Sequence, residues 1–371
     1  MRSKRLTVNL VLSGGGIKGI AYAGVFETGE KRGFQWGNIA GVSAGALAGA
    51  YAAAGYGFQE LLEVLTEFDF STLNINDIPK KVPVVTRFME FQNNSKLRMD
   101  RSVEGFLLKG RGISQSDSYH SDAAHRNLIK DIATYSKEGC LFDGDYLEEW
   151  VYKTLQARGV RTFADLRGGI SDKVNPRGYR MRMTAVDATR KRIVVLPDDM
   201  VFYGVNPDQM EVARAVRMST SVPLAFKPVE YKTVEDGKTK TYQFMDGGVL
   251  DNFPFWLVSK SRRIPSVGFK LSGKEKKKLV SLDTPLSVIK ALIFAAYDTG
   301  VPEPQDNLDF VGEIDTTKVK FLDFNLTKSD KEYLYDAGKT SGAFVFDALR
   351  RKYGPVRRMS LLQMLYRWFA R

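Results

Sequence analysis

The first residue whose position indicates chemistry is a serine in the pentapeptide Gly41-Val42-Ser43-Ala44-Gly45, which has the pattern G-x-S-x-G. Small neighbours allow a sharp turn between a strand and a helix, and such a turn presents the serine hydroxyl to a substrate. The turn also lies at the amino end of the next helix, where the helix dipole stabilises negative charge. We predict that Ser43 is a nucleophile. A glycine-rich turn that only packs a helix against a sheet is the alternative.

Few residues could act as the base for this serine. The sequence contains two histidines, His120 and His125, which stand five positions apart in a polar, irregular stretch. In α/β-hydrolases the histidine of the triad comes last in the chain, and no histidine follows position 125, so that arrangement is excluded. Either histidine could still be the base from that stretch, but the sequence favours both as surface residues. The alternative is a carboxylate that acts directly on the serine, and Asp246 is the strongest candidate because it follows an apolar strand and precedes two glycines. An Asp-Gly turn that closes a hairpin is the structural alternative.

A carboxylate with its ordinary pKa of about 4 is a weak base for a serine hydroxyl. A mechanism of this kind therefore depends on partial burial of the carboxylate and on strong stabilisation of the oxyanion. The loop Gly14-Gly15-Gly16-Ile17-Lys18-Gly19 is suited to the second task. The backbone amides of Gly15 and Gly16 could face an oxyanion with no side chain between them. Lys18 either adds a positive charge there or is an ordinary surface lysine.

The same loop matches the dinucleotide-binding pattern G-x-G-x-x-G between a strand and a helix. A dinucleotide site has an acidic residue at the end of the second strand, about 20 residues further on. Here the second strand ends in Ile39-Ala40-Gly41 and leads directly into the serine turn. The sequence therefore favours an anion cradle over a nucleotide site.

Hydrophobic periodicity predicts strands that alternate with helices. The predicted strands cover residues 6–12, 38–40, 180–186 and 192–196, with a hairpin at 229–242, and the predicted helices cover 17–31, 44–54, 145–158 and 207–216. This alternation predicts the α/β class, with helices packed on both faces of a mainly parallel central sheet.

Two regions do not follow this alternation of strands and helices. Residues 70–139 are polar and too long for an ordinary connection, so they are predicted to form an inserted, lid-like region or a structural excursion. Residues 357–371 mix arginines with apolar side chains and predict a helix that lies on an anionic bilayer or docks on the core. We predict a catalytic domain over 1–275 and a C-terminal extension over 276–371 that packs on the same domain. The lysine run at 274–278 predicts a solvated loop.

The composition excludes several classes of protein. The chain has 371 residues, of which 43% are hydrophobic, so global disorder is excluded. Its one cysteine cannot form an internal disulfide, and with two histidines it leaves little material for a structural zinc site. The formal net charge of +12 favours an anionic partner, either nucleic acid or a phospholipid surface. No stretch predicts a transmembrane helix or a secretory signal, so we expect a cytoplasmic protein with peripheral membrane contact.

Taken together and in order, the three motifs resemble those of the patatin-like phospholipases: Ser13–Gly19, Gly41–Gly45, and Asp246-Gly247-Gly248. Segments 184–187, 213–223 and 249–254, which contain Asp187, Arg217 and Asn252, resemble further parts of that family. The resemblance covers roughly residues 6–60 and 140–270. Three motifs in the family's order are far more specific than any one of them.

The resemblance implies a three-layer α/β/α sandwich and a catalytic dyad of Ser43 and Asp246. It implies hydrolysis of acyl esters in phospholipids or other lipids through an acyl-serine intermediate, with no metal and no cofactor. The residues to which it gives an oxyanion or supporting role are Gly14, Gly15, Gly16, Lys18, Gly19, Gly41, Gly45, Asp187, Arg217, Gly247, Gly248 and Asn252.

Two other functions remain open on the sequence. An acyltransferase on the same scaffold would pass the acyl group to an acceptor other than water. A lipid-binding protein with a degenerate site would bind the membrane surface without catalysis, although the intact serine, aspartate and glycine loop argue against it. Nucleic-acid binding is weaker, and no nucleic-acid partner is expected, because the sequence contains no recognised module for it.

Overall fold

The computed structural model describes residues 5–68, 140, 144–235, 237–259, 261, 263–272, 295, 297, 308–319 and 326–353. Several sequence predictions lie outside these residues. They are the lid-like region at 70–139 with His120 and His125, the lysine run at 274–278 and the helix at 357–371.

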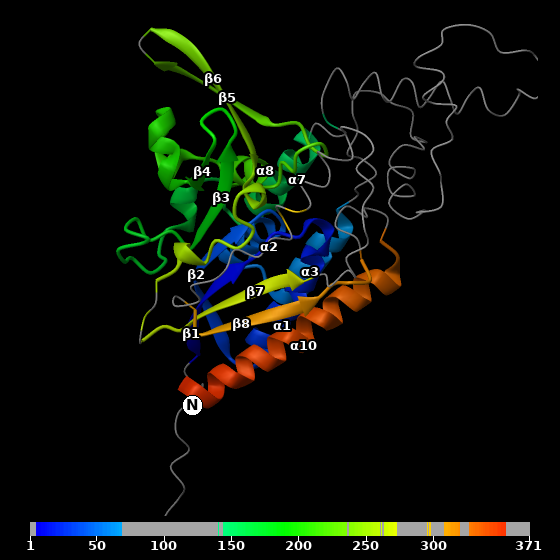
Figure 1. Ribbon diagram of the computed structural model, residues 1–371. Helices are drawn as coiled ribbons and strands as arrows, with labels where there is room; N and C mark the ends of the chain where they lie inside the picture. Colours follow the sequence, from blue (N-terminus) through cyan, green and yellow to red (C-terminus); the bar gives the residue numbers. More distant parts are fainter. Residues whose placement is uncertain are drawn as a thin grey trace, which may run out of the picture.

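A mixed sheet of eight strands forms the centre of the described structure (Figure 1), in the order β5-β6-β3-β2-β1-β7-β8, with β4 paired to β3. The five strands that run parallel to their neighbours from β3 to β8 are β1 (Leu6–Leu12), β2 (Phe34–Val42), β3 (Met181–Asp187), β7 (Ser266–Ser272) and β8 (Phe310–Asp315). The antiparallel strands at the other edge are β4 (Arg192–Leu196), β5 (Val229–Glu235) and β6 (Lys238–Asp246). The predicted α/β class with a mainly parallel sheet is confirmed.

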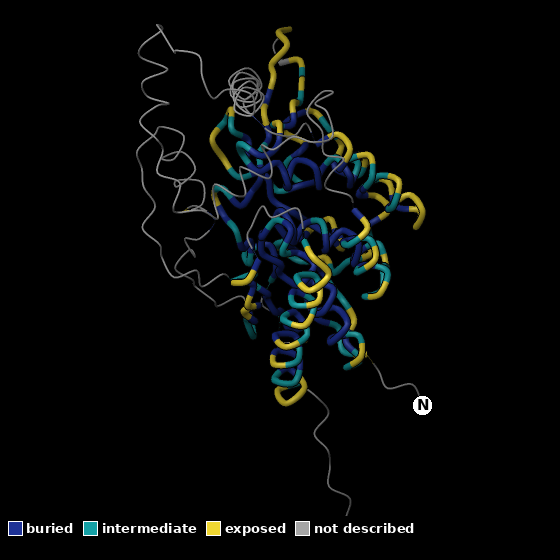
Figure 2. Tube along the Cα trace, turned by 90° about the vertical axis from the view of Figure 1, so that its right-hand side faces the viewer, coloured by how far each residue is buried: buried dark blue, intermediate teal, exposed yellow. Residues whose placement is uncertain are grey.

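Strand β1 shows why the sheet is buried on both sides. Val8, Leu10 and Leu12 face the large apolar core that helices α1, α2 and α10 share with the sheet. Val11 faces a second apolar cluster, formed with segment 253–258. An apolar strand of this kind is typical of the middle of a parallel sheet. Figure 2 shows the buried residues in the middle of the trace and the exposed residues around them.

The α-helices of the described residues are α1 (Ala21–Lys31), α2 (Ala44–Ala53), α3 (Phe58–Glu67), α7 (Asp145–Gln156), α8 (Val212–Ser219) and α10 (Lys328–Tyr353). Short 3-10 helices connect them: η1 (Gly16–Ile20), η3 (Phe163–Leu166), η4 (Asp198–Tyr203), η5 (Pro207–Gln209), η6 (Gly247–Val249) and η7 (Phe255–Leu257).

Some boundaries differ from the sequence prediction because tertiary contacts decide them. The helix predicted from residue 17 begins as the 3-10 turn η1 and becomes α-helical at Ala21. The strand predicted over 38–40 runs from Phe34, whose ring packs 4.9 Å from that of Phe346 in α10. The helix predicted over 207–216 is divided into η5 and α8, because the backbone at Glu211 is extended and bridges Thr162. Helix α10 and strands β7 and β8 were not predicted.

The described part of 276–371 lies on the sheet and core of the preceding residues. Strand β8 extends the sheet beside β7, and α10 runs along α1. A Cβ atom on Gly338 would lie 1.9 Å from the carbonyl oxygen of Ala21, so the two helix backbones approach more closely than side chains allow. Arg32 also forms an ion pair with Asp347 at 2.7 Å. A division of the chain at residue 275 stays a prediction.

Candidate active site

Ser43 occupies a sharp turn between β2 and α2. Its backbone has φ 52° and ψ −121°, a conformation that residues other than glycine rarely adopt. Such a conformation costs on the order of 1–3 kcal/mol and persists only where the surroundings enforce it. The strand-turn-helix context predicted for the pentapeptide is therefore present, and the serine lies at the amino end of α2.

The glycines of the pentapeptide are needed because the turn packs against neighbouring backbone. A Cβ atom on Gly41 would lie 2.5 Å from the carbonyl oxygen of Gly45. A Cβ atom on Gly45 would lie 2.3 Å from the carbonyl oxygen of Leu12, at the end of β1. Neither contact is sterically possible, so both positions require glycine.

The glycine loop after β1 lies beside the serine turn. A Cβ atom on Gly14 would come within 3.2 Å of the Cβ atom of Ser43, and one on Gly19 within 3.0 Å of that of Ala44. The Gly14 amide donates a hydrogen bond to the carbonyl oxygen of Asn252 at 3.2 Å. Among the described residues, the amides of Gly15 and Gly16 have no such acceptor. The loop therefore brings two available amides next to Ser43.

A buried hydrogen-bond network fixes the start of this loop. The Ser13 hydroxyl accepts from the Leu271 amide in β7 at 3.0 Å. The Tyr22 hydroxyl donates to the Ser13 carbonyl oxygen at 2.6 Å and lies 3.2 Å from its hydroxyl. Both side chains are buried. The loop is thus held between the first strand, its neighbour β7 and the helix that follows.

Asp246 is the last residue of β6, and it is fully buried. Its amide donates to the Ser221 carbonyl oxygen at 2.9 Å, and its Oδ1 accepts from the Gly248 amide at 2.7 Å. A Cβ atom on Gly247 would lie 2.6 Å from the carbonyl oxygen of Thr184 in β3, so the turn fits closely against the sheet. The Asp-Gly turn that the sequence offered as a structural alternative is present, and the same turn places the Asp246 carboxylate inside the protein.

Burial raises the pKa of Asp246 to about 7. Hydrogen bonding by the Ser43 hydroxyl, the Gly248 amide and the Tyr297 hydroxyl limits that rise, because each favours the ionised form. Oδ2 is buried, and no described residue donates a hydrogen bond to it with standard geometry. The hydroxyl of Ser43 is therefore close enough to influence the carboxylate.

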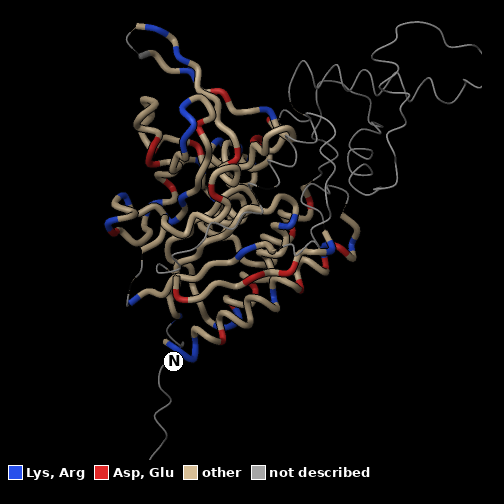
Figure 3. Tube along the Cα trace, in the orientation of Figure 1, with Lys and Arg blue, Asp and Glu red and all other residues tan. Residues whose placement is uncertain are grey.

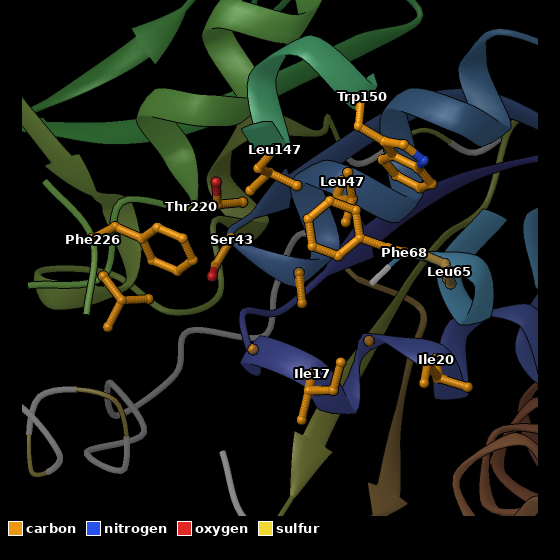
Figure 4. Close-up of a pocket in the computed structure, with 14 residues that line it drawn as sticks. Ile17, Ile20, Ser43, Leu47, Leu65, Phe68, Leu147, Trp150, Thr220 and Phe226 are labelled. Atoms are coloured by element: carbon orange, nitrogen blue, oxygen red, sulfur yellow. The ribbon is translucent and has the colours of Figure 1, made fainter. Parts of the chain in front are cut away.

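An apolar cavity opens beside Ser43 (Figure 4). Aliphatic and aromatic side chains dominate its lining, and the polar side-chain atoms in it belong to Ser43, Thr220 and Trp150. The lining residues are Gly16, Ile17, Gly19, Ile20, Ser43, Ala44, Leu47, Leu65, Phe68, Leu147, Trp150, Thr220, Val222 and Phe226. The cavity therefore joins the glycine loop and the serine turn to helices α3 and α7 and to the segment that follows α8.

A sequence model of the family described as patatin-like phospholipase matches residues 10–258. The chain belongs to the patatin-like phospholipase family. This confirms the resemblance drawn from the three motifs, and it supports lipid hydrolysis as the general class of activity.

Several known proteins are similar to this patatin-like chain. The uncharacterized protein YqhO of Bacillus subtilis is 32% identical over 335 residues, which are 89% of this chain and 94% of YqhO. The crystal structure of VipD from Legionella pneumophila aligns with a TM-score of 0.49 and 17% identity over 93% of this chain and 67% of VipD. ExoU of Pseudomonas aeruginosa, in its complex with SpcU, aligns with a TM-score of 0.39 and 18% identity over 93% of this chain and 52% of ExoU.

The patatin-like site contains a residue whose role the sequence did not show. The Ser219 hydroxyl accepts a hydrogen bond from the Ser43 amide at 3.0 Å and donates one to the Thr184 carbonyl oxygen at 2.7 Å. All three residues are buried. Ser219 therefore ties the strained serine turn to the neighbouring strand β3. Its place at the end of a block with Arg217 was visible in the sequence, but its partner was not.

Arg217 supports the site through the turn after α8. Its guanidinium donates to the Ser221 hydroxyl and, at 2.8 Å, to the Lys227 carbonyl oxygen. It also lies 5.6 Å from the ring of Phe226, which lines the cavity. Because the Ser221 carbonyl accepts from the Asp246 amide, Arg217 holds a segment that contacts both the aspartate and the cavity.

The remaining predicted residues divide into two groups. The Oδ1 of Asn252 would lie 2.2 Å from a Cβ atom on Gly14 and 2.8 Å from one on Gly248, so this side chain fills the space between the two glycine turns. The structure does not bring Asp187 to the site. Its carboxylate accepts from the amides of the β3–β4 turn and from the Tyr203 hydroxyl. Lys18 lies half-buried in η1, next to the glycine loop.

No helix in the part of the chain that the structure describes has the length and apolar character needed to cross a membrane.

Ser219→Ala should lower the free energy of unfolding by about 1–3 kcal/mol, because it leaves the buried amide of Ser43 without an acceptor. Urea unfolding followed by circular dichroism measures this change. The matched control is Ser171→Ala, since Ser171 is exposed and its hydroxyl donates only to a nearby carbonyl. An equal, small effect of both substitutions would contradict the role assigned to Ser219.

Proposed function

We propose that this patatin-like chain is a serine acyl hydrolase that cleaves acyl esters of phospholipids or related lipids. The observation that carries the proposal is the meeting of a strained serine turn, a buried carboxylate and an apolar cavity at one place. Ser43 is common to all three, because it influences the Asp246 pKa and lines the cavity. The family match supports the same class of reaction.

In the proposed mechanism the Ser43 hydroxyl attacks the ester carbonyl carbon, and the Asp246 carboxylate accepts its proton. The tetrahedral intermediate collapses, the alcohol leaves with a proton from Asp246, and an acyl-serine remains. Asp246 then takes a proton from water, which attacks the acyl-serine. Asp246 returns that proton to the Ser43 oxygen as the bond to the acyl group breaks, and the fatty acid is released. The raised pKa of Asp246 suits this role, because a base is most effective when its pKa lies near the working pH.

Backbone amides would stabilise the oxyanion. Those of Gly15 and Gly16 are available beside Ser43, whereas the amide of Gly14 already donates to Asn252. The Ala44 amide is a further candidate, because it begins α2 and the first amides of a helix have no intrahelical acceptor. In serine turns of this type the amide after the nucleophile is a common oxyanion donor. Glycine at 14–16 keeps the approach to these amides free of side chains.

The cavity would bind the acyl chain of the substrate. Its described lining is mostly apolar and contains no charged side chain for a lipid headgroup, whereas burial of hydrocarbon there is favourable by about 25 cal/mol per Å². Phe68 and Trp150 pack edge to face with ring centroids 4.9 Å apart in its wall, and Ile17 and Ile20 line the side formed by η1 (Figure 4). The scissile ester would then lie at Ser43, with the headgroup outside.

Ser43→Ala and Asp246→Asn should each lower fatty acid release by about 10³-fold or more, since each removes one member of the proposed dyad. Release from phospholipid vesicles is measured by mass spectrometry of the products. The matched controls are Ser171→Ala and Asp336→Asn, both at exposed positions, which should release fatty acid at the wild-type rate.

Thermal unfolding of the same variants at pH 8 separates loss of chemistry from loss of fold. Asp246→Asn should be at least as stable as wild type, because it removes a charge that burial disfavours. Equal fatty acid release by wild type, Ser43→Ala and Asp246→Asn would refute the proposed function.

The pH dependence of kcat/KM should show an acidic limb with an apparent pKa near 7. Burial raises the pKa of Asp246, so its basic form is lost as the pH falls below about 7, and the rate should then drop about tenfold per pH unit. The rate on phosphatidylcholine micelles is measured from pH 5 to 9, where this zwitterionic headgroup keeps its charge. A rate that stays constant down to pH 5 would contradict Asp246 as the base.

We further propose that the protein meets its substrate at an anionic lipid surface. The net charge is +12, and Lys and Arg are distributed over many elements, with several on the β5–β6 hairpin (Figure 3). Lys232, Lys238 and Lys240 are exposed on that hairpin, and Val234 beside them is 70% exposed. Basic side chains around an exposed apolar residue suit contact with anionic headgroups.

Binding to vesicles that contain phosphatidylglycerol should weaken as the salt concentration rises, because salt screens such contacts. Lys232→Ala and Lys238→Ala should each weaken binding at low salt about fivefold, corresponding to about 1 kcal/mol per lysine at the surface. Cosedimentation with the vesicles measures binding, and Lys328→Ala, at an exposed position on α10, is the control. Binding that is independent of salt would contradict the proposal.

A further inference from the structure

Tyr297 reaches the proposed catalytic centre from outside the segment that matches the family. The family match ends at residue 258, and the three motifs that define the site lie within it. Tyr297 lies 39 positions beyond that end, and its side chain is buried, with 9% of the residue exposed. None of the motifs singled out in the sequence includes it.

The ring of Tyr297 packs on the turn that follows Asp246. A Cβ atom on Gly248 would lie 2.4 Å from Cε1 and 3.0 Å from Cδ1 of this ring. A side chain at position 248 would therefore collide with the tyrosine ring. The Asn252 side-chain amide donates to the Tyr297 carbonyl oxygen at 3.2 Å, which fixes the backbone at this position. The ring and its backbone are thus both held against the aspartate turn.

The two oxygens of the Asp246 carboxylate have different surroundings. Oδ1 accepts from the Gly248 amide at 2.7 Å. Oδ2 is buried, and within the described residues no group donates to it with standard geometry. Two hydroxyls, those of Ser43 and Tyr297, lie near enough to the carboxylate to favour its ionised form. They approach from different elements, Ser43 from the β2–α2 turn and Tyr297 from the C-terminal part of the chain.

We propose that Tyr297 is a positioning residue, whose hydroxyl donates a hydrogen bond to the Asp246 carboxylate and orients that base toward Ser43. This inference rests on the proposed function, because it assigns a partner to the base in that mechanism. It also means that the segment beyond the family domain completes the catalytic centre.

The physical reason is the burial of the carboxylate. A buried carboxylate without donors is protonated at neutral pH, and a protonated Asp246 cannot accept the proton of Ser43. Among the described residues, the groups that face Asp246 are the Ser43 hydroxyl, the Gly248 amide and the Tyr297 hydroxyl, and none of them is charged. The Ser43 hydroxyl is consumed in the reaction. Tyr297 is therefore the side chain that can hold the base throughout both steps.

Tyr297→Phe keeps the ring on Gly248 and removes only the hydroxyl. The ionised form of Asp246 then loses a donor, so its pKa rises further and the acidic limb of kcat/KM should move to higher pH by about one unit. At pH 6 the rate should fall about tenfold. The assay is fatty acid release from phosphatidylcholine micelles by the full chain, with thermal unfolding measured in parallel.

The matched control is Tyr179→Phe. Tyr179 is buried, and its hydroxyl donates to the Asp208 carboxylate at 2.7 Å, but it precedes β3 at the amino end of that strand, whereas Asp246 pairs with Ala185 near the carboxyl end. This substitution removes a similar bond and should leave the acidic limb unchanged.

Incorporation of 2,3-difluorotyrosine at position 297 tests the opposite direction. Its phenol is a stronger donor, so the acidic limb should move to lower pH while the ring stays in place. A positioning role requires the two changes at 297 to shift the limb in opposite directions. A role in packing alone predicts no shift in either.

The outcomes separate this inference from the function on which it rests. If Ser43→Ala and Asp246→Asn are inactive but the limb stays at the wild-type pH in both Tyr297 variants, only the role of Tyr297 is refuted. If Ser43→Ala or Asp246→Asn keeps wild-type activity, both proposals fail. If Tyr297→Phe does not fold, the difluorotyrosine protein decides the question.

Discussion

The site depends on the close approach of three backbone turns, at residues 14–16, 41–45 and 246–248. A Cβ atom added to Gly41, Gly45 or Gly247 would lie 2.3–2.6 Å from a neighbouring carbonyl oxygen, below the range of real contacts, so these positions require glycine. Two of these glycines flank Ser43, whose backbone conformation is unusual. The turns come from β1, β2 and β6, whose carboxyl ends the sheet brings to one region. The parallel pairing of β1 with β2 and β2 with β3 is therefore a condition of the site, not only of the fold.

The hydrogen bonds around these turns fix the backbone of Ser43 and Asp246 but leave the Asp246 carboxylate with few donors. The Ser219 hydroxyl accepts from the Ser43 amide and donates to the Thr184 carbonyl oxygen, and the Ser221 carbonyl oxygen accepts from the Asp246 amide, so the backbone of Ser43 and Asp246 is fixed. The Asp246 carboxylate, by contrast, is buried with only hydroxyls and one amide near it. A structural aspartate such as Asp187 accepts three good hydrogen bonds and remains a satisfied cap. That contrast separates Asp246, the proposed base, from the capping residue Asp187.

Elements after residue 258, where the family match ends, pack against the family domain and contact the candidate site. Helix α10 packs on α1 through backbone contacts at Gly338, and β8 extends the sheet. Helix α1 follows the glycine loop directly and contributes Tyr22 to its anchor. Support from α10 therefore reaches the loop beside Ser43 through α1. With Tyr297 next to Asp246, residues beyond 258 contact the site from two directions.

The sequence alone identified the main candidate site residues and most of the alternating strands and helices. Tight turns require glycine, and the apolar periodicity of a strand or helix can be seen within a short stretch of sequence. Ser43, the glycine loop and Asp246 are marked in this way, and the lack of a histidine after position 125 pointed to a carboxylate base. Only the tertiary structure decided which supporting residues reach the site. Ser219 contacts Ser43, and Asp246 is the proposed partner of Tyr297. Each partner is far away in the sequence, so no local pattern could identify it. Residue type and spacing select the groups that can react, whereas packing decides their neighbours and therefore their charge.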